Sequence, residues 1–191
     1  MHNDFNWLNE PPQWSVNDDS LHVVTADNSD FWRETWYGFT RHSGHFYYRE
    51  VSEDFTFQVK VNAEFSALYD QAGIMIAIDE QQWLKSGIEF SDGQPMMGSV
   101  LTVGHSDWAT GVFPADAAQF WMRITLKNGC LRLQYSADGI SWPLLRLCRF
   151  PQASHYRIGV MCCTPERAGL SVIFSEINLT PALDLDLHDL S

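Results

Sequence analysis

Residues 83–108 hold the side chains best suited to bind a ligand, because they combine aromatic rings with fixed charges at strand spacing. Side chains alternate across a strand, so Trp83, Lys85 and Glu89 fall on one face of the predicted strand. Lys85 and Glu89 stand roughly 13 Å apart along a strand, so they could contact different parts of one ligand. The opposite face is apolar and is expected to join the core: Leu84, Ile88 and Phe90.

Two neighbouring segments are expected to border this face. Ser106, Asp107 and Trp108 predict a rim loop that would add a second indole and a carboxylate. Residues 28–44 show no strand or helix period, and they carry five aromatic residues among polar ones: Phe31, Trp32, Trp36, Tyr37 and Phe39. This loop either plugs one end of the core or walls a cleft. Plugging is the favoured interpretation, because large aromatic side chains bury readily.

Catalysis by a pair of carboxyl groups is weakly indicated. Glycoside hydrolysis requires two carboxyls about 5–9.5 Å apart. The same-face neighbours of Glu89 are Gly87 and Ser91, so a partner would have to come from another segment, and Asp107 and Asp79 are the candidates. A structural or solvated role is the favoured interpretation for all three carboxylates.

The sequence contains no motif typical of other catalytic classes or of cofactor binding. The chain has no GxSxG, P-loop or dinucleotide signature, so no cofactor is expected. Its seven histidines show no HxH or HExxH spacing, and no metal site is expected. The four cysteines lack CxxC spacing and are expected to be reduced, packed thiols.

The charge balance limits the partners. A net charge of −12 argues against nucleic acid and against an anionic membrane, since both select for clustered Lys and Arg. No apolar run approaches the ~20 residues needed to cross a bilayer, and the first residues do not resemble a signal peptide. A cytoplasmic location is therefore expected.

The pattern of short strands and turn signals predicts an antiparallel β-sandwich in a single domain, residues 1–191. Asn128-Gly129 is the strongest hairpin signal, and a two-residue turn there would pair Leu126 with Leu131, Ile124 with Leu133, and Met122 with Tyr135. The strand at 72–79 has an unusually apolar second face, Met75 and Ala77, which indicates a partly covered surface. The acidic tail from about residue 181 either extends a surface or stays mobile.

Several of these segments resemble the recurring motifs of the DUF1349 family. They are Ala72-Gly73-Ile74-Met75, Trp83-x-Lys85-x-Gly87-x-Glu89, Val100-Leu101-Thr102 and Ser106-Asp107-Trp108, together with 31–38 and 44–46. The resemblance implies a concanavalin A-like jelly roll, as in lectins and glucanases, with a concave and a convex sheet. The E-x-D-x-x-E arrangement of such glucanases is absent here. A yeast member of the family is named for the regulation of enolase.

Three hypotheses follow. The leading one is a non-catalytic, lectin-like module that binds a carbohydrate or small polar ligand on the concave face. Its expected ligand-binding residues are Trp32, Trp83, Lys85, Glu89, Asp107 and Trp108. The second is a glycoside-active enzyme that uses Glu89 with Asp107 or Asp79. The third is a regulatory module whose partner is a metabolic enzyme.

Overall fold

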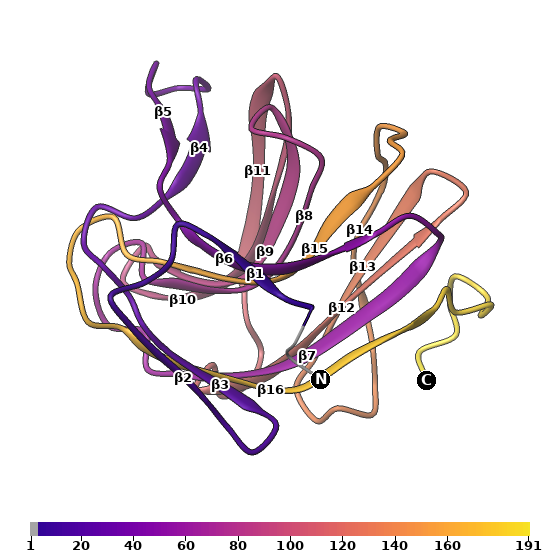
Figure 1. Ribbon diagram of the computed structural model, residues 1–191. Coiled ribbons are helices and arrows are strands. Elements are labelled where there is room, and N and C mark those ends of the chain that lie inside the picture. Colours follow the sequence, from indigo (N-terminus) through magenta and orange to yellow (C-terminus); the bar gives the residue numbers. More distant parts are fainter. Residues whose placement is uncertain (1–3) are drawn as a thin grey trace.

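A computed structural model describes residues 4–191 and contains two large antiparallel sheets packed face to face (Figure 1). Sheet A has the spatial order β1 (Asn6–Leu8), β6 (His45–Val51), β15 (Tyr156–Cys163), β8 (Gln71–Ala77), β9 (Gln82–Ser91), β10 (Gln94–Val103) and β11 (His105–Val112). Sheet B has the order β14 (Leu144–Arg149), β13 (Cys130–Ser136), β12 (Gln119–Lys127), β7 (Phe55–Ala63), β16 (Ser171–Pro181), β3 (Ser20–Val24) and β2 (Gln13–Asn17). A separate hairpin consists of β4 (Phe31–Arg33) and β5 (Thr40–His42).

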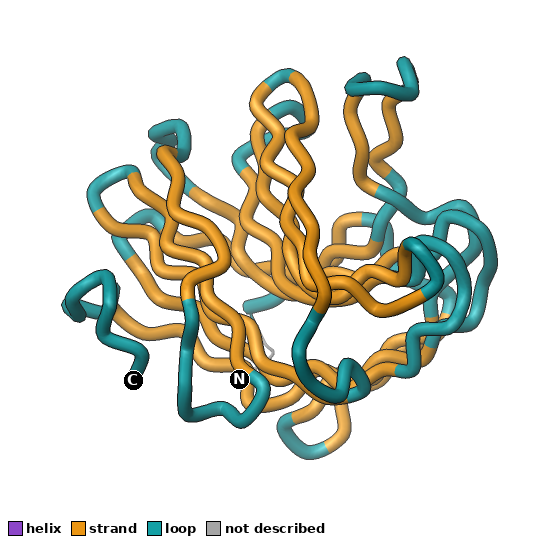
Figure 2. Tube along the Cα trace, turned by 180° about the vertical axis from the view of Figure 1, so that it is seen from behind, coloured by secondary structure: helices purple, strands orange, loops and turns teal. Residues whose placement is uncertain are grey.

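Residues 4–191 form strands and loops without a helix, as Figure 2 shows, so this part of the chain contains no helix that could span a membrane. The predicted antiparallel jelly-roll sandwich is confirmed. All four cysteines are free thiols, and Cys162 and Cys163 are buried.

The main core lies between the two sheets and follows the period of two expected for half-buried strands. In β7 the four inward side chains are fully or almost fully buried, while Gln58, Lys60 and Asn62 between them are partly exposed. The inward residues are Phe55, Phe57, Val59 and Val61. Burial of this apolar surface is the dominant favourable contribution to folding.

Two-residue turns fix the register of the hairpins. Asn128 and Gly129 both have positive φ, 52° and 71°, as a type I′ turn requires. The β12–β13 pairing of Leu126 with Leu131, and the two pairs beyond it, confirm the predicted register. Asp92 and Gly93 form the same kind of turn between β9 and β10. The local sequence therefore sets these pairings.

A second apolar cluster lies on the outer face of sheet A, the face turned away from sheet B. The hairpin β4–β5 covers it and projects from the body of the molecule at the upper left of Figure 1. The cluster contains Phe31 and Trp32 of the hairpin and, from the sheet, Phe46, Met75, Ala77, Trp83, Val100, Met161 and Cys163. It accounts for the apolar second face of β8, which the sequence predicted to be covered.

Two segments differ from their predicted local structure. Residues 28–44 contain the strands β4 and β5 instead of being irregular throughout. Each strand has only three residues, too few for an alternation to be visible in the sequence. Residues 106–108 lie inside β11 and not in a rim loop, since they pair with Val100, Leu101 and Thr102 of β10.

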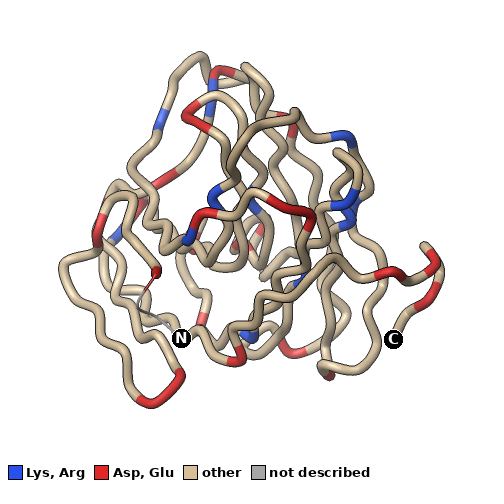
Figure 3. The backbone as a smooth tube through the Cα atoms, turned by 45° about the vertical axis from the view of Figure 1, so that its right-hand side comes forward, with Lys and Arg blue, Asp and Glu red and all other residues tan. Residues whose placement is uncertain are grey.

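The acidic C-terminal tail lies along the outer face of sheet B. The main-chain oxygens of Leu187 and Asp189 accept hydrogen bonds from Arg132 at 2.9 and 2.8 Å. Leu190 accepts one from the amide of Trp142 at 2.8 Å. Figure 3 shows the acidic residues of this segment in red at the right-hand side. The tail thus packs on the face opposite to the hairpin β4–β5.

Candidate functional site

A cavity of about 170 Å³ opens on the outer face of sheet A, beside the hairpin β4–β5. Its floor comes from β8, β9 and β10, one wall from the edge strand β11 and the other from the hairpin. The lining residues are Asp30, Trp32, Tyr37, Phe39, Arg41, Tyr69, Gln71, Lys85, Glu89, Val100, Trp108, Pro165 and Glu166. Small, mostly apolar cavities with a few polar groups are the usual form of a ligand site.

Lys85 is the buried cation of this cavity, with 3% of its surface exposed. Its ammonium group donates to the carboxylate of Asp30 at 3.1 Å and to the amide oxygen of Gln71 at 2.6 Å. Burial opposes the charged form, but the combined attraction of Asp30, Cys163 and Glu89, with the hydrogen bond to Asp30, outweighs it and raises the pKa of Lys85. Lys85 is therefore a charged, fully engaged side chain that ties β9 to β8 and to the base of the hairpin.

Asp30 reaches Lys85 from the start of the hairpin, and the backbone holds it there. Its carboxylate also accepts the amide of Phe31 at 2.8 Å, and its main-chain oxygen accepts the amides of Ser43 and Gly44 at 2.9 Å each. The two ends of the hairpin thus meet at Asp30, directly above the sheet.

Glu89 is the unusual side chain of the site. In the register it lies opposite Gln71 on one side and Met96 on the other. Its carboxyl has no hydrogen bond or ion pair with any residue among 4–191. Burial raises the pKa of Glu89 to about 7; Lys85 acts in the opposite direction, and Asp30 adds to the rise. Glu89 thus brings a poorly compensated carboxyl group to the cavity.

Aromatic rings form the walls. Trp32 of β4 and Trp108 of β11 meet edge to face, with ring centroids 6.3 Å apart. Tyr37 packs edge to face on Trp32 at 5.7 Å and stacks on Phe39 at 5.4 Å. Its hydroxyl lies 3.3 Å from that of Tyr69, across the cavity mouth. The hairpin therefore supplies one aromatic wall and the edge strand β11 the other.

Glycine residues leave part of the floor without side chains. Gly73, Gly87 and Gly98 are neighbours across β8, β9 and β10. A Cβ atom on Gly87 would come within 2.0 Å of the main-chain oxygen of Ala72, so the close approach of β8 and β9 requires glycine there. Beside Trp108, a smaller hollow of about 20 Å³ lies over Gly87 and Gly98. A ligand can approach bare backbone at this point.

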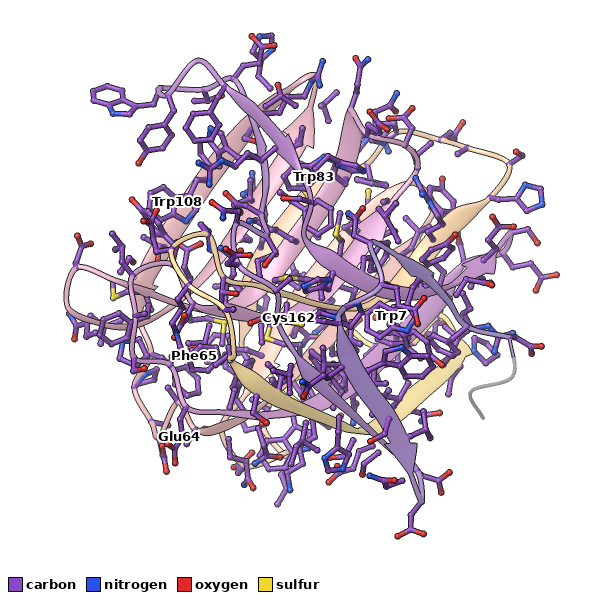
Figure 4. All side chains as sticks on the ribbon, turned by 60° about the vertical axis from the view of Figure 1, so that its left-hand side comes forward. Trp7, Glu64, Phe65, Trp83, Trp108 and Cys162 are labelled. Carbon is purple, nitrogen blue, oxygen red and sulfur yellow. The ribbon has the colours of Figure 1, made fainter. Side chains whose placement is uncertain are left out.

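The structure brings four of the six expected ligand-binding residues together at the cavity: Trp32, Lys85, Glu89 and Trp108. It places Trp83 elsewhere, since Trp83 is only 1% exposed and lies in the second apolar cluster. Its indole donates to the main-chain oxygen of Glu80 at 3.2 Å. In Figure 4 Trp83 lies among the strands, whereas Trp108 lies nearer the left-hand edge. The alternation of side chains predicted that Trp83 lies on an open face of the strand. In the structure the hairpin β4–β5 covers that part of the face and buries Trp83.

Asp107 also differs from its expected position. It precedes Trp108 on the same strand and so points to the other side of sheet A, where it pairs with Arg146 of β14 at 2.9 Å. Asp79 accepts the amide of Gln81 within the β8–β9 connection and does not line the cavity. Neither carboxylate therefore joins Glu89, and the carboxyl pairs considered from the sequence are not formed.

The aromatic loop 28–44 fulfils both of the roles that the sequence left open. Phe31 is completely buried and packs within the second apolar cluster. Tyr37 and Phe39 remain partly exposed and form a wall of the cavity. Asp30, Tyr69 and Gln71 were not expected at the site. Gln71 carried a usable signal, because a polar residue on an otherwise apolar strand face needs a partner. Asp30 and Tyr69 could not be recognised from the sequence, because only the tertiary fold brings them to the cavity.

Within residues 4–191, no three side chains of His, Cys, Asp or Glu are grouped so that they could hold a metal ion. Beside the strands, the polar groups of the cavity are the paired Lys85 with its partners Asp30 and Gln71, and the unpaired carboxyl of Glu89. Such a set suits an organic ligand with hydrogen-bond donors.

Comparisons with known proteins agree with this architecture. The model of the family "Protein of unknown function (DUF1349)" matches residues 7–182. The chain is 52% identical to "Regulation of enolase protein 1" of Saccharomyces cerevisiae over 185 residues, 97% of this chain and 93% of the relative. A crystal structure of a functionally unknown protein from Saccharomyces cerevisiae superimposes with a TM-score of 0.93 at 51% identity, covering 94% of this chain and 97% of the other.

More distant structures share the fold alone. The carbohydrate-binding module CBM66 of Bacillus subtilis has a TM-score of 0.59 at 11% identity, and the match covers 94% of this chain and 98% of the module. A mutant of the GH43 protein BlXynB of Bacillus licheniformis has a TM-score of 0.70 at 15% identity, but the match covers only 37% of that longer chain and 94% of this one. The sandwich is thus a fold that also occurs in carbohydrate-binding and glycoside hydrolase proteins.

Proposed function

Because the chain belongs to DUF1349, a family of unknown function, membership leaves its activity open, and we propose a role in binding. In this proposal the cavity on the outer face of sheet A binds a carbohydrate or a similar small polar ligand without catalysis. The observation that carries the proposal is the Glu89 carboxyl, which faces an aromatic cavity without a protein partner.

Glu89 is half-buried, so its carboxyl loses part of its hydration without gaining a protein partner, which costs free energy. Hydroxyl or N–H groups of a ligand would remove this cost at Glu89. Trp108 is 38% exposed and offers an open ring to the apolar side of such a ligand. The paired Lys85 keeps the floor rigid, because it holds three separate segments together.

A glycoside-active enzyme is less well supported. The pKa of Glu89, about 7, would suit a general acid. The reaction requires a second carboxyl, however, and of the other two at the cavity Asp30 is already paired with Lys85 and Glu166 is exposed to solvent. Asp107 and Asp79 lie away from the cavity, as described above. Binding without turnover therefore requires fewer assumptions.

A protein partner is the second candidate function, and one observation favours it. Trp36, at the tip of the hairpin β4–β5, is 93% exposed. Exposed tryptophans are frequent anchors of protein interfaces. The name of the yeast relative points to enolase as the partner to test. Sedimentation of this protein with purified enolase, for the wild type and for Trp36→Ala, would decide this candidate.

The proposed ligand site is tested by thermal denaturation of the wild type against an array of sugars and small metabolites. A ligand present at about 100 times its Kd should stabilise the protein by about 2.7 kcal/mol. Trp108→Ala should remove that shift. The matched control is Asp107→Asn, one residue away but on the other side of the sheet, which should retain it. A shift that survives in Trp108→Ala would place the ligand elsewhere, and an array without any stabilising compound would contradict the proposal.

A further inference from the structure

We propose that the ligand of this cavity carries a positively charged ammonium group, which lies against Glu89 and is enclosed by the rings of Trp32, Tyr37 and Trp108. This inference rests on the proposed binding function and specifies the chemical class of the ligand. Its basis is the charge that remains at the cavity once every ion pair has been accounted for.

Five charged side chains line the cavity: Asp30, Arg41, Lys85, Glu89 and Glu166. Asp30 and Lys85 form an ion pair at 3.1 Å, so their charges largely cancel. Glu166 is exposed to solvent. Arg41 lies over the ring of Phe39, 4.8 Å from its centroid, and keeps its charge. Beyond the Asp30–Lys85 pair, the lining therefore holds two carboxylates and one guanidinium, and Glu89 is the less exposed of the two carboxylates.

The walls favour the same sign of ligand charge. The face of an aromatic ring carries negative potential and attracts cations, most strongly for Trp. Trp32, Tyr37 and Trp108 line the same cavity as Glu89 and contact one another edge to face. Aromatic rings beside one carboxylate can hold an ammonium group through cation–π attraction and an ion pair.

Other classes of ligand gain less from this arrangement. An anion would meet Glu89 and the negative ring faces. A neutral polyol could donate hydroxyls to Glu89 but would gain no ion pair and no cation–π attraction. The volume of about 170 Å³ suits a single head group, since one water molecule occupies roughly 30 Å³ in the liquid.

Protonation of Glu89 should control this binding. The pKa of Glu89 is about 7, so its carboxylate is populated above that pH and lost below it. The other titratable groups that face the cavity are Asp30, Tyr37, Arg41, Tyr69, Lys85 and Glu166. Glu89→Gln separates the contribution of Glu89 from theirs, because it keeps the shape of the side chain without the charge.

The test uses three probes and titration calorimetry at pH 8. Choline carries a permanent ammonium charge, 3,3-dimethylbutan-1-ol has the same shape without the charge, and glucose represents a neutral polyol. Choline should bind the wild type and Asp107→Asn about tenfold more tightly than its neutral isostere, or better. In Glu89→Gln this preference should disappear. In the wild type, choline affinity should fall by several-fold when the pH is lowered from 8 to 6, and in Glu89→Gln it should not.

The outcomes separate this inference from the proposed function. Equal affinity for choline and its isostere, or glucose binding that exceeds choline binding and is lost in Trp108→Ala, overturns the ammonium inference and leaves the binding function intact. Failure of all three probes to bind overturns the ammonium inference, while the sugar and metabolite array decides the binding function. A choline preference that persists in Glu89→Gln would also contradict the inference, because it would place the cation elsewhere.

Discussion

At the scale of single residues, the site combines one satisfied charge with one unsatisfied charge on the same strand. Lys85 and Glu89 share a face of β9, yet Lys85 has two hydrogen-bond partners at 3.1 and 2.6 Å while Glu89 has none within residues 4–191. Their contributions to stability should therefore have opposite signs. Lys85 stabilises the fold through its partners, and ionised Glu89 destabilises it.

The Glu89→Gln variant should be more stable than the wild type at pH 8 and about equally stable at pH 5. The pKa of Glu89 rises from 4.5 to about 7 in the folded protein. A raised pKa means that the stability present below pH 4.5 is lost as the pH rises through 7. The gain of the variant at pH 8 should be on the order of 1–3 kcal/mol. Urea denaturation at both pH values measures it, and an equal difference at pH 5 and pH 8 would refute this role of Glu89.

Replacement of Lys85 by Met should destabilise the protein by about 3 kcal/mol or more, because it leaves the carboxylate of Asp30 without its partner. The double variant Lys85→Met/Asp30→Asn should cost less than the single Lys85 variant, since it removes the uncompensated charge. Chemical denaturation of the two single variants and the double variant gives the coupling free energy. Strictly additive costs would show that the two residues do not depend on each other.

Sequence alternation correctly predicted that Lys85 and Glu89 lie on one face and that Leu84 and Ile88 lie in the core. It could not predict their surroundings. Asp30, the charged partner of Lys85, is 55 residues away in the chain. The hairpin that begins at Asp30 also buries Trp83. A period of two reports which side of a sheet a residue faces, but not what covers that side.

At the scale of elements, the orientation of the hairpin β4–β5 decides the shape of the cavity. The hairpin meets β6 at Gly44, and a Cβ atom there would lie 2.3 Å from the ring of Phe31 and 2.6 Å from the sulfur of Cys163. Phe31 and Cys163 both belong to the second apolar cluster, which holds the hairpin on sheet A. Glycine at this point is what allows the hairpin to pack closely.

Gly44→Ala should therefore cost about 1–3 kcal/mol of stability, as overpacking of a core does. It should also weaken ligand binding, because displacement of Phe31 moves Trp32 and Tyr37 with it. Gly111→Ala on β11 is the matched control, since a Cβ atom there meets nothing within 4 Å. Denaturation and ligand titration of the two variants check this, and equal effects of the two substitutions would contradict the role of Gly44.

The elements themselves were predictable where the turn is encoded locally. Asn128-Gly129 set the register of β12 and β13 because both residues accept positive φ. The strands β4, β5 and the start of β11 were not predicted as strands. Each depends on pairing or packing with distant parts of the chain, such as the hydrogen bond from the amide of Arg33 to Ser106 at 2.9 Å.

At the scale of the whole molecule, the two faces of the sandwich carry different structures. Sheet A supports the hairpin and the cavity on β8, β9, β10 and β11, the half of the sheet that ends at the edge strand β11. Sheet B carries the acidic tail on its outer face. The fold class followed from the short alternating strands, but the assignment of strands to sheets depends on long-range pairing, which no local pattern contains.

The most direct test of the binding site is the indole N–H region of the NMR spectrum, because the chain has eight tryptophans in distinct places. Two of them, Trp32 and Trp108, line the cavity, while Trp83 is buried beneath the hairpin and Trp121 and Trp142 lie on sheet B and its loops. Titration with a ligand from the array, or with choline, should shift the Trp32 and Trp108 signals most and leave Trp121 and Trp142 unchanged. A ligand that stabilises the protein but shifts Trp121 or Trp142, with Trp32 and Trp108 unmoved, would contradict the assignment of the site to this cavity.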